Sequence, residues 1–355
     1  MKIAVLFGGT STEHEISLRT GTFISKTLSS MGHSVKPILI SREGRWVIPK
    51  EYRPEFPEGN SKNPEEYLKE FEELHSTSAG AFSSLDCDVA FLGLHGTSGE
   101  DGSVQGFLKV LGIPFTGSDV KASALAMDKI RANRLFQLSG MSVAPFWELR
   151  KRDYSENPTL VENSGLEYPL FLKPVEGGSS FHTFRIEGPE DLRKRLPEFF
   201  DAEEHAILQK FLKGTEVSCG VWEKKEGSKR ILEALPPTEI IPGGEFFDVE
   251  SKYKPGLSQE ITPARLPEKI ISKIQEQSVL AHKTLGCEGY SRTDFIIVGE
   301  TPFVLETNTL PGMTETSLIP QQAKAAGIPI QTLYQSLIDQ ALERAGREAQ
   351  SLASH

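Results

Sequence analysis

Two polar side chains interrupt an apolar stretch near the C-terminal end of the chain. Residues 303–305 read Phe-Val-Leu, as in a buried strand, and Glu306 and Asn308 follow before a Pro-Gly pair. Side chains alternate between the two faces of a strand, so Glu306 and Asn308 are predicted to point the same way. A carboxylate and an amide on one face supply the hard oxygen ligands that Mg²⁺ prefers.

A preceding strand is predicted to pair with this one across a loop of residues 299–301. With that three-residue loop, Asp294 lies opposite Glu306. Arg292 then lies opposite Asn308, whereas a two-residue loop would turn Asp294 to the other face. Two facing carboxylates repel each other unless a cation or a proton lies between them. The pattern therefore indicates either a Mg²⁺ site beside an arginine suited to phosphate, or a solvated hairpin face with a salt bridge.

Phosphoryl chemistry would also need residues that hold a polyphosphate. The sequence contains neither G-x-x-x-x-G-K-[ST] nor G-x-G-x-x-G, so the two common phosphate motifs are absent. Lys173 ends a predicted strand just before the loop PVEGGSSF, whose backbone amides and hydroxyls could fold over a phosphate. Lys129 on a predicted helix could contact a phosphate, or could be an exposed surface lysine. Glu216 at a strand end could hydrogen-bond a ribose, or could be an ordinary surface charge.

Polar residues also follow two predicted strands in the first third of the chain. STEHE follows the strand at 2–7, and HGTSGEDG ends the stretch that begins as a strand at residue 87. Open α/β sheets bind ligands at the carboxyl ends of their strands. The same segments also suit a helix N-terminus and a tight turn. Glu13 in the first segment could hold a substrate ammonium, and His95 in the second lies near two acids.

The order of predicted elements indicates an α/β fold. A strand, a helix with Ile16, Ile24 and Leu28 on one face, and a second strand open the chain as a β-α-β unit of doubly wound type. Further strands are predicted at 87–96, 113–117, 205–212, 215–222, 230–237, 290–298 and 302–308. One more strand begins near residue 169 and enters the glycine-serine loop after Lys173. Helices are predicted at 64–75, 119–139, 189–200, 267–285 and 330–346. Residues 238–258 mix glycine, proline, charges and aromatics without a period, which is typical of a lid or binding loop.

Composition limits the possible partners. The chain has 355 residues and a net charge of −10, which argues against nucleic acid or an anionic membrane as its main partner. Three cysteines far apart in sequence form no CxxC pair, which favours a reducing cytoplasm. The N-terminal apolar run is too short for a signal peptide, and no run of 18 apolar residues predicts a membrane span.

Taken in order, seven segments resemble those of the D-alanine–D-alanine ligases within the ATP-grasp superfamily. They are GGTSTEHEISLRTG, HGTSGEDG, MDKIRAN, KPVEGGSS, SKYKPG, SRTDFII and LETNTLPGMTETSLIP. The resemblance runs from residue 8 to 320 and implies a three-domain ATP-grasp architecture. The implied domains are an N-terminal Rossmann-like substrate domain 1–118, a central ATP-grasp subdomain 119–212, and a C-terminal ATP-grasp subdomain 213–355 with the lid 238–258 and the metal site.

The resemblance also implies roles for individual residues. Those implied to contact ATP are Lys129, Lys173, Gln209, Lys210, Leu212, Glu216 and Lys252. Those implied to hold two Mg²⁺ ions, with Mn²⁺ able to substitute, are Asp294, Glu306 and Asn308. Glu13 is implied to bind the ammonium of the first D-alanine, and Ser179 and Tyr253 to form a hydrogen-bonded set with it. Arg292 and the Gly312 amide are implied to stabilise the oxyanion. Those implied to contact substrate elsewhere are His95, Ser317 and Leu318. Two positions depart from the family pattern, because Gln209 stands where an acid is usual and His182 where a glycine is usual.

The implied activity is ATP-dependent joining of two D-alanines through an acylphosphate, giving D-alanyl-D-alanine for peptidoglycan synthesis. The resemblance further implies a cytoplasmic homodimer acting on a small-molecule substrate. One alternative is an ATP-grasp ligase for a different carboxylate and amine. A second is a nucleotide-binding module without catalysis, although every implied metal ligand and the arginine are present. A third is an NAD-dependent dehydrogenase, which the missing glycine fingerprint disfavours.

Overall fold

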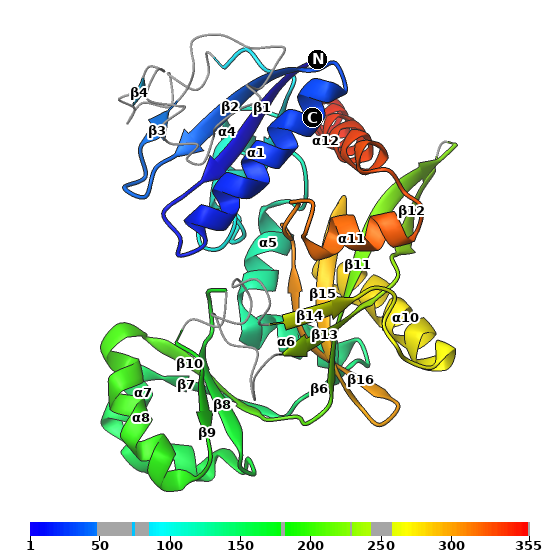
Figure 1. Ribbon diagram of the computed structural model, residues 1–355. Coiled ribbons are helices and arrows are strands. Elements are labelled where there is room, and N and C mark those ends of the chain that lie inside the picture. Colours follow the sequence, from blue (N-terminus) through cyan, green and yellow to red (C-terminus); the bar gives the residue numbers. More distant parts are fainter. Residues whose placement is uncertain (48–72, 75–84, 179–181, 228, 243–257, 354–355) are drawn as a thin grey trace.

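The computed structural model describes residues 1–47, 73–74, 85–178, 182–227, 229–242 and 258–353. Its strands form three sheets. Figure 1 shows one sheet near the two chain ends, one built from residues 146–210 at the opposite end of the molecule, and the largest between them. Helices pack against all three, which confirms the predicted α/β class. No described helix combines the length and the apolar composition needed to cross a bilayer.

The first sheet has the strand order β4-β3-β2-β1-β5 and contains the predicted β-α-β opening, with β1 parallel to β2 and β5. Its elements are β1 (Lys2–Gly8), α1 (His14–Ser30), β2 (Ser34–Ile40), β3 (Trp46–Val47), β4 (Glu73–Leu74), β5 (Val89–Leu92) and α4 (Ser103–Val110). The strand predicted at 113–117 is reduced to a single parallel bridge between Ala90 and Phe115. Pro114 has no N–H group with which to extend that ladder.

The helix predicted at 64–75 is wrong at its C-terminal end. Glu73 and Leu74 instead form β4, which pairs antiparallel with β3. The helical pattern was local, whereas β3 offers a sheet edge that another strand can cover. Residues 64–72 of that prediction lie outside the described residues.

Helix α1 lies unusually close to β1. A Cβ atom on Gly21 would lie 2.1 Å from Cγ of Phe7, so the helix rests on the strand only because glycine has no side chain. Ser17 Oγ accepts from the Gly8 N–H at 2.8 Å and donates to the Gly93 carbonyl at 2.6 Å. These contacts join the carboxyl ends of β1 and β5 to the first turns of α1.

The second sheet is small and antiparallel, with the order β7-β10-β8-β9. Its elements are β7 (Phe146–Arg150), α7 (Lys151–Glu156), the 3-10 helix η1 (Pro158–Ser164), β8 (Leu170–Pro174), β9 (Phe184–Ile186), α8 (Pro189–Ala202) and β10 (His205–Lys210). Leu172, Leu196 and Leu208 are fully buried between this sheet and its helices. The predicted helix at 189–200 and the predicted strand at 205–212 are confirmed to within a few residues.

The third sheet has the order β14-β13-β11-β15-β16-β6, and β12 pairs with β11. Its strands are β6 (Ser142–Val143), β11 (Thr215–Glu226), β12 (Lys229–Ala234), β13 (Thr238–Pro242), β14 (Ser258–Ile261), β15 (Tyr290–Val298) and β16 (Thr301–Asn308). Its helices are α5 (Val120–Met127), α6 (Lys129–Leu138), α10 (Glu268–Leu285) and α11 (Leu318–Ala325). Helices α5, α6 and α10 share one core with this sheet. Most of residues 119–143 therefore pack with the third sheet, and Ile130 of α6 also shares a small buried cluster with Ile207 of the second sheet.

The segment expected to form a lid is only partly described. Its first residues, Thr238–Pro242, are β13, and Ser258 begins β14. The two strands pair antiparallel, with Pro242 opposite Ser258. Residues 243–257 lie outside the described residues.

The hairpin of β15 and β16 brings together the predicted residues by a route that differs from the prediction. Val298 lies opposite Thr301, so the loop is the two-residue Gly299–Glu300 and the predicted three-residue loop is wrong. That loop alone would turn Asp294 away from the site. Leu305 is an extra residue in β16, a β-bulge between the pairs Phe295–Val304 and Asp294–Glu306. The bulge restores the predicted pairing of Asp294 with Glu306.

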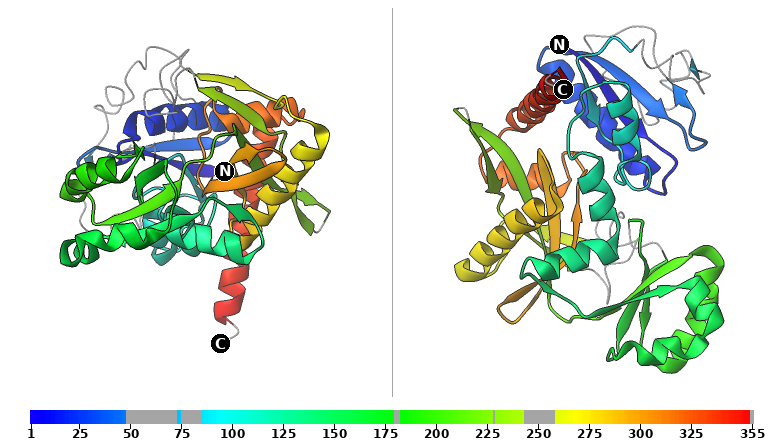
Figure 2. Two further views of the ribbon diagram at one scale, coloured as in Figure 1. Left: turned by 90° about the horizontal axis from the view of Figure 1, so that it is seen from below. Right: turned by 180° about the vertical axis from the view of Figure 1, so that it is seen from behind.

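Helix α12 (Ile330–Ala353) connects the first and third sheets. Leu333, Tyr334 and Leu337 belong to the same core as β1 and β5, and the Tyr334 ring centroid lies 5.0 Å from that of Phe91. The same helix contacts β11 of the third sheet. In the view from below in Figure 2, its C-terminal end projects beyond the rest of the molecule. The helix predicted at 330–346 therefore begins correctly and ends too early.

Candidate active site

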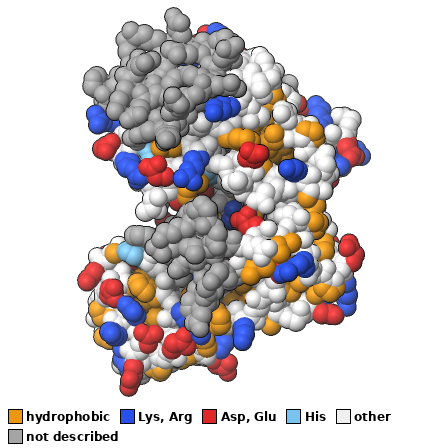
Figure 3. All heavy atoms as spheres, viewed as in Figure 1, with side chains coloured by type: hydrophobic (Ala, Val, Ile, Leu, Met, Phe, Trp, Pro, Cys, Tyr) orange, Lys and Arg blue, Asp and Glu red, His pale blue; other side chains and the backbone are white. Residues whose placement is uncertain are grey.

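Two adjoining cavities, of about 920 and 1240 Å³, lie where the three sheets face each other. In the space-filling view the molecule is narrowest at mid-height, between the part that holds α1 and the part that holds α8 (Figure 3). The predicted residues that line both cavities are Glu13, Lys129, Glu216, Asp294 and Glu306. The smaller cavity also contacts Arg292 and Asn308, and the larger one Lys173 and Gln209.

The hairpin places a partly buried ion pair at the cavity wall. Arg292 Nε and Nη2 donate to the two Asp294 oxygens at 2.9 and 2.8 Å, and the Ser218 hydroxyl donates to Oδ1 at 2.5 Å. Burial by itself would lower the pKa of the Arg292 guanidinium, but the neighbouring carboxylates, Asp294 foremost and then Glu306 and Glu100, together raise it by more. The net shift in pKa is upward, so Arg292 remains a fixed positive charge in the cavity.

The hairpin residues fit a magnesium ion by their chemistry. Asp294 and Glu306 are directly opposed across the strands, and Arg292 is opposed to Asn308. Among the described residues no group of three His, Cys, Asp or Glu side chains is placed to hold a metal, so the third protein ligand would be the amide oxygen of Asn308. That oxygen accepts from the Leu310 N–H at 2.8 Å and has a second lone pair available. Carboxylate and amide oxygens together are a suitable set for Mg²⁺.

Three cationic or amide groups that were predicted to contact ATP line the larger cavity. Lys129 begins α6, and its Nζ donates to the Gly177 carbonyl at 2.7 Å, so this lysine holds the glycine-serine loop. Lys173 on β8 donates to Gln209 Oε1 at 3.2 Å. Because lysine is only a donor, this contact fixes the amide oxygen of Gln209 toward Lys173. The buried Nε2 atom of Gln209 has no hydrogen-bond partner among the described residues.

The remaining predicted nucleotide contacts come from the end of β10 and the start of β11. Lys210 Nζ donates to the carbonyls of Glu167 and Tyr168 at 3.0 and 3.2 Å, so its side chain supports that turn. Leu212 lines the larger cavity only, and Glu216 lines both. This segment therefore lines the larger cavity, while the Lys210 ammonium is bound to the carbonyls of the neighbouring turn.

Glu13 enters the site from the loop between β1 and α1. Its backbone N–H donates to Ser11 Oγ at 3.2 Å, and Ser11 Oγ donates to the His95 carbonyl at 2.7 Å. A Cβ atom on Gly96 or Gly178 would lie 3.1 and 3.4 Å from the Glu13 carboxylate. Two loops far apart in sequence thus lie against this carboxylate, and a side chain at Gly96, where φ is +69°, would crowd both Ser11 and Glu13.

His95 connects the first sheet to the end of the hairpin. Its Nδ1 lies 3.2 Å from the Leu310 carbonyl, and its Nε2 lies 2.8 Å from the Thr20 hydroxyl. Glu100 lies 3.5 Å from Nδ1. Burial raises the pKa of the Glu100 carboxyl, and the negative charge of Glu13 raises it further. With both ring nitrogens in contact with protein groups, His95 supports the cavity wall.

The loop before α11 closes the other side of the smaller cavity. Ser317 Oγ accepts from the Thr314 N–H at 3.0 Å and lies 2.7 Å from the Thr314 hydroxyl. A Cβ atom on Gly312 would lie 2.8 Å from Ser317 Oγ, so the loop folds tightly over that glycine. Gly312, Ser317 and Leu318, the first residue of α11, all line the cavity.

Some predicted residues are not described, and some lining residues were not predicted. Ser179, Lys252 and Tyr253 lie outside the described residues. Ser218 and Leu305, which contact Asp294 and the larger cavity respectively, were missed. Ser218 was discoverable because it lies two residues after Glu216 on the same strand face.

Comparison with known proteins agrees with this geometry. The family model described as D-ala D-ala ligase N-terminus matches residues 2–118, and the one described as D-ala D-ala ligase C-terminus matches residues 135–339. A D-alanine--D-alanine ligase from Leptospira interrogans is 56% identical over 97% of this chain and 99% of its own length. The chain belongs to the D-alanine–D-alanine ligase family. The family resemblance stated from the sequence is thereby confirmed.

Solved structures of ligases share the fold of this chain. The VanG D-Ala:D-Ser ligase from Enterococcus faecalis has a TM-score of 0.82 and 31% identity, covering 96% of this chain and 99% of its own. The Bacillus anthracis D-alanine--D-alanine ligase complexed with ATP has a TM-score of 0.74 and 30% identity, covering 98% of this chain and 99% of its own. Ligases named for different second substrates therefore share this fold, so the second substrate must be argued from individual residues.

Proposed function

We infer that this chain is an ATP-dependent ligase that joins two D-alanine molecules into D-alanyl-D-alanine, with ADP and phosphate as the other products. The dipeptide would serve peptidoglycan synthesis. The observation that carries the inference is the hairpin, which directs Arg292, Asp294, Glu306 and Asn308 toward cavities that Glu13 and Lys129 also line. Membership of the ligase family supports the same conclusion.

The first half of the reaction would activate a carboxylate. Glu13 would bind the ammonium group of the first D-alanine, because its carboxylate is held at the cavity by two glycine loops. Lys129, Lys173 and Lys252 would neutralise the phosphates as the γ-phosphoryl group moves to the D-alanine carboxylate. The resulting acylphosphate has a good leaving group, whereas a free carboxylate reacts poorly with an amine.

The second half would form the peptide bond. The amine of the second D-alanine would attack the acyl carbon, and phosphate would leave. Arg292 and the Gly312 N–H would stabilise the tetrahedral oxyanion, a role that suits the permanently charged Arg292 guanidinium. Ser317 and Leu318 would hold the carboxylate of the second D-alanine, with His95 supporting the cavity wall.

Divalent metal would be held by Asp294, Glu306 and Asn308. When bound, Mg²⁺ supplies charge stabilisation at the phosphoryl oxygens. We propose two ions, with Mn²⁺ able to substitute, because two carboxylates and an amide offer more oxygen ligands than one ion needs from protein. Arg292 would release part of its contact with Asp294 when that carboxylate takes up metal.

Nucleotide binding would use the larger cavity. Gln209, Lys210 and Leu212 would line the adenine, and Glu216 would meet the ribose. The unpartnered Nε2 of Gln209 could donate to a ring nitrogen of the base, so an amide is able to serve where the family usually has an acid. His182, the other departure from the family pattern, has a positive φ of 50° and lies 3.1 Å from a Glu203 oxygen.

Several broader features remain proposals. We propose domains at 1–118, 119–212 and 213–355, with residues 119–143 packing on the C-terminal sheet. Residues 238–258 would form a lid that excludes water from the acylphosphate. The enzyme would be a cytoplasmic homodimer. Sedimentation would test the dimer, and a monomer at micromolar concentration would contradict it.

Tyr253 and Ser179 are proposed to form a hydrogen-bonded set with Glu13 that selects an amine as the second nucleophile. Tyr253→Phe should then loosen discrimination between D-alanine and D-lactate, since an unpaired buried partner costs about 1–3 kcal/mol. A product assay with both compounds in competition would measure this. An unchanged product ratio and rate in the variant would contradict the role.

The overall function is tested by measuring phosphate release and dipeptide formation together. Purified protein would be given ATP and Mg²⁺ with D-alanine, L-alanine, D-lactate or D-serine. We expect phosphate and D-alanyl-D-alanine in equal amounts with D-alanine and little product with L-alanine. Rapid turnover with a different acceptor, and none with D-alanine, would instead favour a ligase for another carboxylate and amine.

A further inference from the structure

A buried arginine outside both cavities joins three separate segments of the chain. Arg344 on α12 is 7% exposed. It donates to the Phe115 carbonyl at 2.6 Å, to the Gly117 carbonyl at 2.8 Å and to Glu288 Oε2 at 2.5 Å. Its guanidinium carbon also lies 4.3 Å from the centre of the Phe115 ring. One planar group therefore fixes the end of the first sheet and the approach to β15 at the same time.

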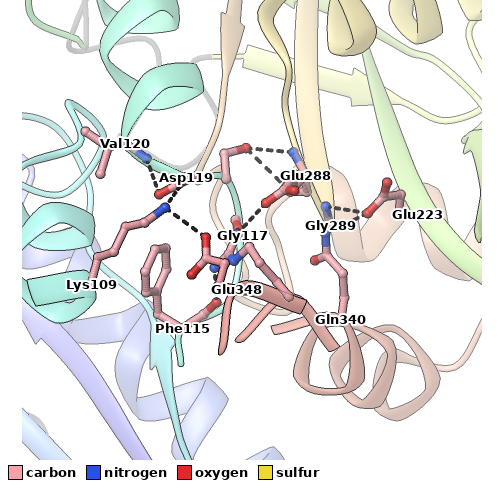
Figure 4. Close-up of polar contacts among 12 residues, drawn as sticks. Lys109, Phe115, Gly117, Asp119, Val120, Glu223, Glu288, Gly289, Gln340 and Glu348 are labelled. Carbon is pink, nitrogen blue, oxygen red and sulfur yellow. Dashed lines mark hydrogen bonds and ion pairs between the residues drawn. The ribbon is translucent and has the colours of Figure 1, made fainter. Parts of the chain in front are cut away.

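A second side chain of α12, one helical turn earlier, contacts the same approach to β15. Gln340 Nε2 donates to Glu223 Oε2 at 2.7 Å, and the Gly289 N–H donates to that same oxygen at 3.0 Å. Figure 4 shows Glu288 and Gly289 lying between Gly117 on one side and Gln340 and Glu223 on the other. The start of β15 is thus held by two residues of α12 that are four positions apart.

The first route from Arg344 to the active site runs through the Gly117 backbone. Gly117 has a φ of +86°, and a Cβ atom there would lie 3.0 Å from the Leu310 side chain. Leu310 in turn donates its N–H to Asn308 Oδ1 at 2.8 Å, and its carbonyl lies 3.2 Å from His95 Nδ1. A shift of Gly117 would therefore reach both a proposed metal ligand and the wall of the substrate cavity.

The second route runs along β15 itself. Glu288 precedes Arg292 by four residues, and the strand between them is extended and paired with β11. The Ser118 hydroxyl also accepts from the Glu288 N–H at 3.1 Å. A displacement at Glu288 would be carried along the strand to Arg292, because an extended paired strand has little freedom to absorb it.

We propose that Arg344 is a positioning residue for the ligase reaction. It sets the separation between the N-terminal side of the cavity, with Glu13 and His95, and the hairpin side, with Arg292 and Asn308. The proposal rests on the ligase function inferred above. A planar guanidinium suits this task, since its donors diverge at fixed angles toward three acceptors, which a lysine ammonium on a flexible stem does not reproduce.

Arg344→Lys tests the proposal because it keeps the charge and changes only the geometry. Misplaced reacting groups lose on the order of 100-fold for about 1 Å, so we expect kcat to fall at least about 10-fold at saturating ATP and D-alanine. The ratio of phosphate released to dipeptide formed is the decisive readout. A misaligned second D-alanine lets water attack the acylphosphate and return D-alanine and phosphate, so this ratio should rise from one to two or more.

Glu343→Gln is the matched control, because it changes the neighbouring position on the same helix. Glu343 pairs with Lys225 and Arg230, at 2.7 and 2.9 Å, which lie on the β11–β12 hairpin away from the cavities. The control should keep kcat within twofold of wild type and a ratio of one. Glu288→Gln, which leaves Arg344 in place without its carboxylate partner, should raise the ratio as Arg344→Lys does.

The outcomes separate positioning from stability and from the ligase function itself. A loss of folded protein lowers phosphate and dipeptide equally and leaves their ratio at one. The proposal is therefore overturned if Arg344→Lys and Glu288→Gln both keep a ratio of one, whatever happens to kcat. A wild-type enzyme that makes no dipeptide would overturn the proposed function, and this inference with it.

Discussion

Replacing Asp294 with asparagine removes a charge from the hairpin and keeps nearly the same volume. In the wild-type chain both Asp294 oxygens accept from Arg292, at 2.9 and 2.8 Å, and one of them also accepts from Ser218. Asparagine keeps one acceptor and turns an N–H group toward the guanidinium or the hydroxyl. Arg292 would then remain partly buried without its counter-charge and with only part of its hydrogen bonding.

The free energy of unfolding should fall by about 2–3 kcal/mol in this variant. Removing one partner of a buried ion pair typically costs about 3–5 kcal/mol. The side chains of Arg292 and Asp294 are 19% and 13% exposed and face a cavity, so water reduces the cost toward or below the lower value. Ser218→Ala removes only the hydroxyl contact and should cost about 1 kcal/mol.

Urea unfolding measures these differences in the free energy of unfolding. The proteins compared are wild type, Asp294→Asn, Ser218→Ala and the double variant Arg292→Met with Asp294→Asn. The double variant should regain most of the lost stability, since no buried charge is left unpaired. Ligase activity should not return, and every variant without Asp294 should lose on the order of 100-fold or more in kcat/KM. Wild-type stability together with wild-type activity in Asp294→Asn would refute the reasoning.

Other parts of the fold allow shorter tests. Glu306→Gln should keep the fold and abolish turnover, and near-normal rates at ordinary Mg²⁺ concentrations would remove Glu306 from the metal site. Burial lowers the pKa of His282 to about 4 from 6.5, so its stabilising effect is complete above pH 6.5 and is lost as pH falls toward 4. Between pH 7.5 and 4.5 that loss is about 2.5 kcal/mol, and urea unfolding should show His282→Gln losing that much less than wild type. Deleting Leu305 should remove the bulge and leave the proposed metal ligands paired. It should raise the KM for ATP about 10-fold by taking an apolar side chain from the cavity, and a changed Mg²⁺ dependence would contradict this.

The hairpin shows which part of the site was predictable from sequence. Alternation along β15 correctly placed Arg292 and Asp294 on one face, because the odd-numbered residues between them and around them are buried in the core. The loop length was wrong by one residue, and the bulge at Leu305 was not foreseen. The two errors compensated. A bulge has little local signal when the extra residue is as apolar as its neighbours, since backbone geometry rather than composition defines it.

Contacts between distant segments were the least predictable feature. Long helices such as α10 and α12 have a strong period and were found, whereas the short elements α4, α11, β6 and β7 were missed. The contact of His95 with Leu310 and the burial of Arg344 depend on how separately folded units meet. No spacing within one segment carries that information, because tertiary packing decides it.

The contact of Gly21 with Phe7 limits which amino-acid substitutions this chain can accept in evolution. The two positions share one small volume, with only 2.1 Å between the Phe7 ring and the place where a side chain would begin. Any larger residue at 21 would lift α1 from the sheet, and with it the loop that carries Glu13. Substitutions at these two positions should therefore be coupled across relatives, with alanine or serine at 21 found only alongside a smaller residue at 7. The position of Glu13, the proposed substrate-binding carboxylate, would thus depend on a pair of core residues that lie outside the cavity.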